Sequence, residues 1–370
     1  MTVNPLVQLG ELGQSPWFDY ITREMLQTGE LERLIARDGL RGMTTNPTIF
    51  EKAVAGSDRY DADIRALADS GLKPGEIFEA LAVADVQRAC DMFLALYRST
   101  DARDGFVSIE VSPDLANDTE GTAREAQRLW DAVQRPNVMI KIPGTQAGLA
   151  AITRTLARGI NVNVTLLFGI ERYRAVMEAY FAALEQRRAR QEPINHLASV
   201  ASFFVSRVDG KIDPMLDKAG NPGGLRGTIA IANALVAYEA FLNTFRGPRW
   251  DALAREGARV QRPLWASTST KDPKYPDVYY VEALIAKDTV NTLPPETFAA
   301  YRDHGRPEGR ITPQTIAQAK DRLQALARSG IKLDEVTHAL EIDGVQKFSA
   351  SYAALLNGVG QKALALSGAA

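Results

Sequence analysis

The sequence contains a single cysteine, Cys90, and only three histidines among 370 residues. One cysteine excludes an intramolecular disulfide and any zinc site built from several cysteines. The histidines (His196, His304 and His338) do not lie within helical spacing of one another, which argues against a histidine-rich metal site. We therefore expect a protein without a metal ion.

A strong charge imbalance and a long hydrophobic run are also missing. The sequence has 43 basic and 45 acidic residues, a formal net charge of -2, which removes a global electrostatic case for binding nucleic acid or a membrane surface but leaves room for a local basic pocket. No apolar run approaches the ~20 residues that span a bilayer. Residues 1–14 lack the basic region and apolar core of a secretory signal. We expect a cytoplasmic protein.

The length suggests either two domains of ~150 residues or one large barrel with insertions. Short apolar runs alternate with segments of helical period, the clearest of which covers 173–184. Alternating strands and helices favour parallel pairing, and eight strands are typical of a (β/α)8 barrel, although a doubly wound open sheet fits the same alternation. The eight predicted strands are 15–20, 40–44, 105–111, 137–142, 160–166, 197–203, 262–267 and 289–293.

One predicted strand places a lysine inside an apolar run. In 138–142, one face carries Val138, Ile140 and Ile142. Met139 and Lys141 share the other face. A buried lysine is costly unless it is paired. The alternative is a lysine at the strand end whose amine extends to solvent.

Several other predicted strands carry polar side chains on one face, towards their C-terminal ends. Barrel enzymes place their chemistry at that end, so the repetition of this pattern predicts a functional site. The residues on this face are Trp17 with the polar Asp19, Thr44 with Asn46, Ser108 with Glu110, Asn161 with Asn163 and Thr165, and the single residues Ser202 and Ser267.

This residue set limits the chemistry. Without histidine or cysteine, serine–histidine hydrolysis lacks its base, and the carboxylates are too few for a two-metal site. A lysine amine held among apolar residues can attack a carbonyl and form an imine. Asp19 and Glu110 are then the candidates for moving protons, and the asparagines suit a hydroxyl-rich substrate.

Four motifs in order resemble those of transaldolases, in particular the longer bacterial type. They cover roughly 15–295 and consist of 42–50 (GMTTNPTIF), 138–145 (VMIKIPGT), 161–168 (NVNVTLLF) and 202–207 (SFFVSR, where the family has SPFVGR). The resemblance implies one (β/α)8 barrel domain over 1–370, without a cofactor. Because a plain barrel needs ~250 residues, we expect helical insertions near 51–104 and 211–261 and a helical tail after Gly305.

The resemblance also implies a reaction. A dihydroxyacetone unit passes from sedoheptulose 7-phosphate or fructose 6-phosphate to an aldose phosphate, in the non-oxidative pentose phosphate pathway. By motif match, Lys141 forms the imine and Asp19 removes the proton of the C4 hydroxyl. Glu110 and Thr165 match the pair that positions a catalytic water.

Substrate-binding residues follow from the same match. Asn46 and Asn163 correspond to residues that bind the donor's hydroxyls, and Ser202 to a further substrate contact. Arg207 and Ser267 fall where the phosphate is held. Two positions later, where shorter transaldolases have a phosphate-binding arginine, this chain has Ser269. We expect Lys271 to supply the missing charge, and the alternative is a solvated lysine.

Three rival interpretations stay open from the sequence. The first is a lysine aldolase of the same superfamily that splits fructose 6-phosphate and releases free dihydroxyacetone. The second is a barrel that only binds or scaffolds, and the third is a pyridoxal-phosphate enzyme. We expect small sugar phosphates as partners and a monomer or homodimer.

Overall fold

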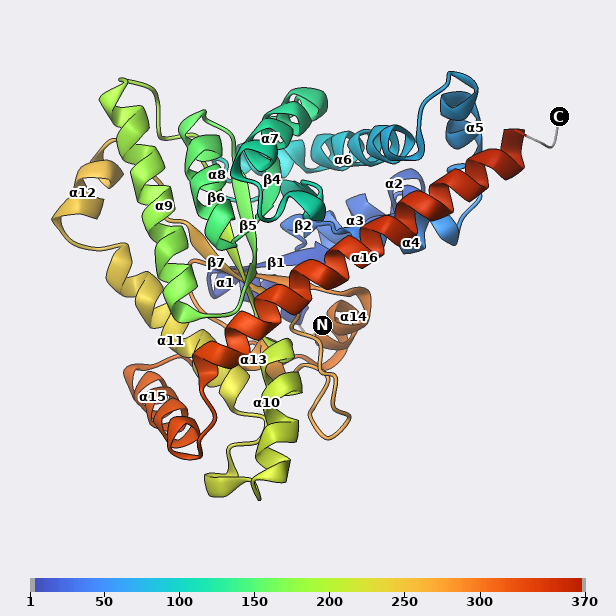
Figure 1. Cartoon of the computed structure of the whole chain (residues 1–370). Helices are drawn as coiled ribbons and strands as arrows, with labels where there is room; N and C mark the ends of the chain where they lie inside the picture. Colours follow the sequence, from blue (N-terminus) through green and yellow to red (C-terminus); the bar gives the residue numbers. More distant parts are fainter. Residues whose placement is uncertain (1–3, 368–370) are drawn as a thin grey trace.

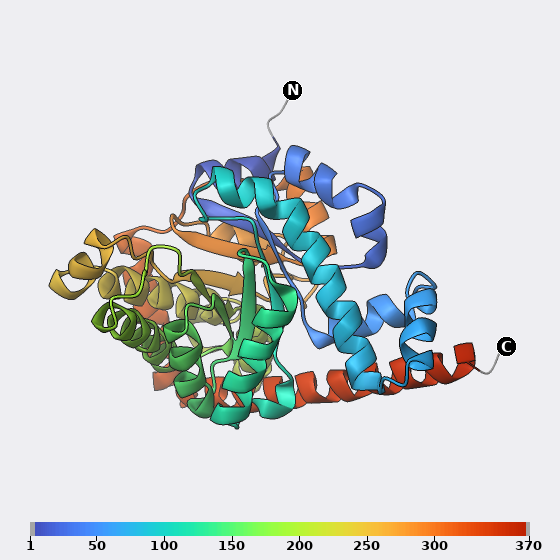
Figure 2. The same cartoon turned by 90° about the horizontal axis from the view of Figure 1, so that it is seen from above.

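The computed structural model describes residues 4–367, and its centre is a closed barrel of eight parallel strands in the order β1 to β8. Helices surround the barrel (Figures 1 and 2). The (β/α)8 prediction is confirmed, and the open sheet is wrong because β1 pairs with both β2 and β8. The strands are β1 (Gln14–Asp19), β2 (Gly42–Thr44), β3 (Phe106–Glu110), β4 (Val138–Pro143), β5 (Val162–Leu167), β6 (Ser199–Phe204), β7 (Arg262–Ala266) and β8 (Thr289–Leu293).

Sixteen α-helices lie among the described residues. Crossover helices link parallel strands, as this topology requires. The helices are α1 (Pro5–Glu11), α2 (Arg23–Gln27), α3 (Glu30–Arg37), α4 (Pro47–Ala55), α5 (Asp61–Asp69), α6 (Pro74–Ser99), α7 (Thr119–Val133), α8 (Gln146–Ala157), α9 (Ile170–Ala189), α10 (Ser206–Lys218), α11 (Ile229–Thr244), α12 (Pro248–Arg255), α13 (Tyr279–Ala283), α14 (Pro295–His304), α15 (Pro313–Arg328) and α16 (Leu333–Ser367).

The segments expected to carry insertions hold more than one helix each. Helices α4, α5 and α6 lie between β2 and β3, and α10, α11 and α12 lie between β6 and β7. The chain after Gly305 forms α15 and α16. No helix among residues 4–367 combines the length and apolarity needed to cross a membrane.

The middle of the barrel is closed by large side chains. Trp17 of β1 is fully buried and lies beside its register partner Gly42 of β2. A Cβ atom at position 42 would lie 2.4 Å from the Trp17 ring, so only glycine leaves room for the indole. The barrel is therefore a packed core rather than a pore, and its two ends are separate environments.

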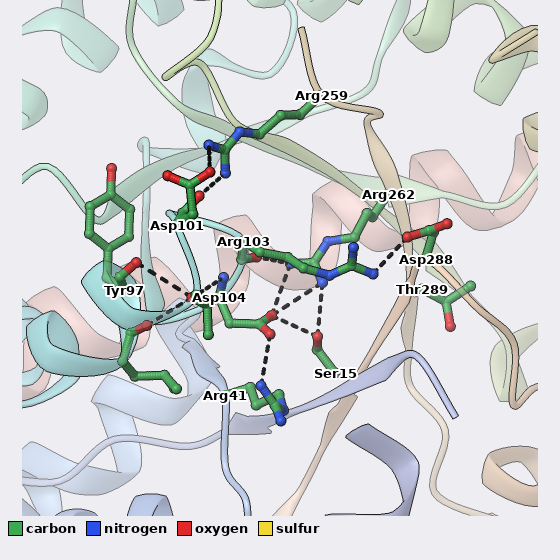
Figure 3. Close-up of polar contacts among 12 residues, drawn as sticks. Ser15, Arg41, Tyr97, Asp101, Arg103, Asp104, Arg259, Arg262, Asp288 and Thr289 are labelled. Carbon is green, nitrogen blue, oxygen red and sulfur yellow. Dashed lines mark hydrogen bonds and ion pairs between the residues drawn. The ribbon is translucent and has the colours of Figure 1, made fainter. Parts of the chain in front are cut away.

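A buried polar network closes the N-terminal end of the barrel (Figure 3). Arg262 of β7 donates from Nη1 to Ser15 Oγ at 2.8 Å and contacts Asp104 Oδ1 at 3.2 Å. Arg41 also contacts Asp104, at 3.3 Å. The side chains of Arg262 and Asp104 are only 7% and 3% exposed, so this ion pair belongs to the interior.

The last helix, α16, runs across the width of the molecule (Figures 1 and 2). It packs against α4, α5 and α6, which follow β2, and against α10 and the end of β5. Phe348 and Leu355 of this helix are buried. Helix α16 thus lies at the end of the barrel opposite to the Arg262 network.

Candidate active site

A cavity of about 470 Å³ opens at the C-terminal ends of the strands. Eight of the ten site residues predicted from the sequence line it, although they come from segments as far apart as β1 and the chain after β7. These eight are Asp19, Asn46, Lys141, Thr165, Ser202, Arg207, Ser267 and Lys271. The other two contact residues of this lining: Glu110 pairs with Lys141, and Asn163 accepts a hydrogen bond from Ser202.

Lys141 is buried and paired. It is the fourth residue of β4, is 4% exposed, and its Nζ lies 3.1 Å from Glu110 Oε2 and 3.0 Å from the carbonyl oxygen of Thr45. Glu110 is the register partner of Lys141 on the neighbouring strand β3. The alternative of a strand-end lysine reaching solvent is wrong, because backbone pairing holds this amine inside the barrel beside a carboxylate.

Glu110 has a perturbed carboxyl group. Burial raises its pKa to about 6, although the positive charge of Lys141 acts in the opposite direction. Its Oε1 has no hydrogen-bond partner among residues 4–367, and neither has the buried Oγ1 of Thr165. Buried polar atoms are normally paired, so these two atoms have free capacity for a water or a substrate hydroxyl.

Asp19 stands at the end of β1 and accepts a hydrogen bond from Thr44 Oγ1 at 2.6 Å. Thr44 Oγ1 in turn lies 2.7 Å from Thr292 Oγ1, so hydroxyls of β2 and β8 fix the carboxyl. Burial raises the pKa of Asp19, while the charge of Lys141 and the Thr44 hydrogen bond lower it. Because burial favours the protonated form, this carboxyl is suited to act as an acid–base group that both takes and returns a proton.

The two predicted asparagines hold the structure around the site. Asn46 is the N-cap of α4, and its Oδ1 accepts the backbone N–H of Ile49 at 3.0 Å. Asn163 is fully buried, donates to Ser108 Oγ at 3.0 Å, and accepts from Ser202 Oγ at 2.7 Å. Asn46 reaches the cavity directly, whereas Asn163 supports Ser202 from behind.

Two positive side chains besides Lys141, Arg207 and Lys271, line the cavity from the segments after β6 and β7. Arg207 is the second residue of α10, and its guanidinium lies 5.0 Å above the Phe204 ring. Its Nη1 has no hydrogen-bond partner among the described residues. Lys271 lies in the chain after β7 and donates to Ser269 Oγ at 2.6 Å. Together these groups can bind an anion such as a phosphate.

Ser267 occupies a strained position beside this cluster. Its φ of +55° lies in the left-handed region, which is uncommon for serine, and its Oγ lies 3.0 Å from Ser206 Oγ at the start of α10. Strained backbone of this kind concentrates at functional sites. The strain turns the chain sharply after β7 and keeps Ser267 in the cavity wall.

Among the lining residues that the site prediction missed, Lys52 and Phe348 stand out by their chemistry. Lys52 of α4 brings another positive charge to the cavity, and Phe348 of α16 brings an aromatic ring. For Lys52, the only indication in the sequence is its position two residues after the 42–50 motif. For Phe348, the sequence predicts only that it lies in the helical tail after Gly305. Among residues 4–367, no group of three or more His, Cys, Asp or Glu is placed to hold a metal ion.

Comparison with known proteins shows the family of this chain. The family model described as Transaldolase/Fructose-6-phosphate aldolase matches residues 16–359. A transaldolase of Frankia alni is 49% identical over 361 residues, which cover 97% of each chain. Transaldolase 2 of a Nostoc strain is 45% identical over 380 residues, which cover 99% of this chain and 100% of the relative. The chain therefore belongs to the transaldolase/fructose-6-phosphate aldolase family.

Proposed function

We propose that this protein is a transaldolase of the non-oxidative pentose phosphate pathway. It transfers a dihydroxyacetone unit from sedoheptulose 7-phosphate or fructose 6-phosphate to glyceraldehyde 3-phosphate or erythrose 4-phosphate. It uses a lysine imine and needs no cofactor. The observation that carries the proposal is Lys141, a buried amine 3.1 Å from Glu110 in the wall of a polar cavity.

The reaction starts with attack of the Lys141 amine on the C2 carbonyl of the ketose. Glu110 accepts the proton that the amine loses and returns a proton to the departing hydroxyl, so that water leaves and the imine forms. The unpaired Oε1 of Glu110 and Oγ1 of Thr165 support this step, because both can hold the water.

Cleavage of the bond between C3 and C4 follows. Asp19 takes the proton of the C4 hydroxyl, the C4 oxygen becomes the carbonyl of the departing aldose phosphate, and the electron pair moves to the imine nitrogen. A dihydroxyacetone enamine stays on Lys141. The acceptor aldehyde is attacked by this enamine, and Asp19 gives its proton to the new hydroxyl.

Binding groups orient the substrate along the cavity. Asn46 and Ser202 contact hydroxyls of the donor, and Asn163 fixes the orientation of Ser202. Arg207 and Ser267 hold the phosphate, and Lys271 adds the charge that shorter relatives draw from an arginine. Arginine's planar fork suits the oxygens of a phosphate, whereas Lys271 acts as a point charge.

A transfer assay tests the function. Fructose 6-phosphate and erythrose 4-phosphate should give sedoheptulose 7-phosphate and glyceraldehyde 3-phosphate, and Lys141→Met should abolish this reaction in a folded protein. The absence of transfer in the unaltered protein would contradict the proposal. Release of free dihydroxyacetone as the main product would instead favour the fructose 6-phosphate aldolase activity that the family also contains.

We also propose the setting in which the enzyme works. The whole chain forms one barrel domain in the cytoplasm, as a monomer or homodimer. Its partners are small sugar phosphates, and it binds neither nucleic acid nor a membrane. The formal net charge of -2 supports the absence of both kinds of binding, since it gives no global attraction to nucleic acid or to an anionic membrane surface.

A further inference from the structure

Helix α16 is held over the cavity by contacts on both sides of the barrel mouth. On the side of β5, Arg172 of α9 pairs with Glu341 at 3.3 Å. On the side of β2, Thr48 of α4 donates to Ser351 Oγ at 2.8 Å. Figures 1 and 2 show the helix crossing between these two sides. The turn that contains Phe348 lies between the two anchors.

A glycine allows α16 to lie close to the strand ends. A Cβ atom at position 344 would lie 3.0 Å from the side chain of Leu166. Leu166 has a φ of +60° and sits at a register shift of β5, directly after Thr165. The close approach at Gly344 therefore lowers the next turn of α16 onto the cavity that Thr165 lines.

Phe348 is the aromatic residue of that turn. It is 6% exposed, it lines the same cavity as Lys141, and its ring centroid lies 5.6 Å from Lys141 Nζ. A ring at this distance attracts a cation and keeps its surroundings apolar. Phe204, the other phenylalanine of the cavity wall, is instead engaged by the Arg207 guanidinium.

We propose that Phe348 determines how the intermediate on Lys141 is divided between transfer and hydrolysis. This inference rests on the proposed imine at Lys141. After cleavage, the enamine has two fates. It can attack an acceptor aldehyde, or it can take a proton at carbon and become a cationic iminium. Water then adds to C2, the bond between C2 and Nζ breaks, the proton returns to the amine, and free dihydroxyacetone leaves.

The ring opposes the second fate in two ways. It covers the side of Lys141 that faces α16 and excludes water there, which protects a reactive intermediate from hydrolysis. It also stabilises the cationic iminium relative to the neutral carbinolamine that water addition produces. Phe348 touches the intermediate without exchanging a proton or forming a bond, and so it acts as a specificity-determining residue.

The experiment measures both events in one time course. Enzyme is mixed with fructose 6-phosphate without an acceptor, and glyceraldehyde 3-phosphate and dihydroxyacetone are followed separately. The proposed function predicts a burst of one glyceraldehyde 3-phosphate per active site, followed by a slow phase limited by hydrolysis. The inference predicts that Phe348→Leu and Phe348→Ala keep the burst and accelerate the slow phase by about 2- to 30-fold, the range that a lost cation–π contact gives.

Leu355→Ala is the matched control. Leu355 is buried on the same helix, 2% exposed, and is not part of the cavity wall, so its loss loosens the packing of α16 without opening the site. It should leave the slow phase unchanged. An intact burst with an unchanged slow phase in both Phe348 variants would overturn the inference alone, as would equal acceleration by Leu355→Ala. The absence of any burst in the unaltered enzyme would overturn the proposed function and the inference together.

Discussion

The buried ion pair at the N-terminal end of the barrel gives a sharp prediction about stability. Asp104→Asn removes the negative charge that faces Arg262, and the barrel interior offers that arginine no other carboxylate contact in the described structure. Loss of one partner from a buried pair costs about 3–5 kcal/mol, because the remaining charge stays buried without compensation. Arg262 keeps its hydrogen bonds to Ser15 and to the Arg103 carbonyl, which favours the lower end of that range.

The effect can be measured as a thermal midpoint. At ~2.1 cal/mol/K of unfolding entropy per residue, a chain of this length has about 0.8 kcal/mol/K, so a loss of about 3 kcal/mol lowers Tm by about 4 °C. Asp288→Asn is the control, since Asp288 pairs with Arg103 at 2.6 Å where the two side chains are 30% and 48% exposed. An exposed pair contributes at most about 1 kcal/mol, or roughly 1 °C here.

The double variant Asp104→Leu/Arg262→Met completes the test. Replacing both charges by apolar side chains should recover much of the lost stability, because neither charge is then left buried. Transferase activity should be unchanged in all three proteins, since the packed centre of the barrel separates this network from Lys141. If Asp104→Asn lowers Tm no more than Asp288→Asn, the buried pair does not carry the stability assigned to it.

Three further predictions concern the active site. Asp19→Ala should slow carbon–carbon cleavage more than imine formation in single-turnover experiments, and near-normal turnover would show that another group moves the proton. With a Glu110 pKa of about 6, kcat should fall about tenfold per pH unit below pH 6 as the base becomes protonated, and Glu110→Gln should lack this limb. The same raised pKa means that Glu110 favours the folded state below pH 4.5 and loses that contribution as the pH rises through 6. Arg207→Lys should raise KM for fructose 6-phosphate by at least about tenfold, because a hydrogen bond to a charged group contributes roughly 1.5–3 kcal/mol, whereas Lys271→Ala should raise it by no more than about fivefold. Equal effects of the two substitutions would contradict the division of the phosphate site.

The barrel could be predicted because eight short apolar runs alternate along the chain with segments of helical period. Closure could not be derived from that pattern, since an open sheet has the same alternation, and only the pairing of β1 with β8 decides it. Strand ends shifted by up to two residues; β2, for example, begins at Gly42 rather than at Leu40. A strand ends where its hydrogen bonds to the neighbouring strands end, and the local sequence says little about where that is.

The site residues that lie at the ends of strands could be predicted from the sequence. Lys141, Asp19 and Thr165 follow from alternation, because residues on one face of each strand converge at the C-terminal end. Lys52 and Phe348 could not be found in this way, since they lie on helices whose placement over the mouth depends on tertiary packing. Asn163 shows a further limit, because periodicity places it on the inner face but cannot tell a buried hydrogen-bonding partner of Ser202 from a residue of the cavity wall.

Borohydride trapping shows which lysine forms the imine, because reduction fixes the bond between the substrate carbon and the lysine nitrogen. The enzyme is reduced with sodium borohydride in the presence of fructose 6-phosphate, digested, and mapped by mass spectrometry. We expect a dihydroxyacetone adduct on the peptide that contains Lys141, and loss of activity in proportion to its formation. An adduct on a different lysine, or full inactivation without any adduct at Lys141, would contradict it.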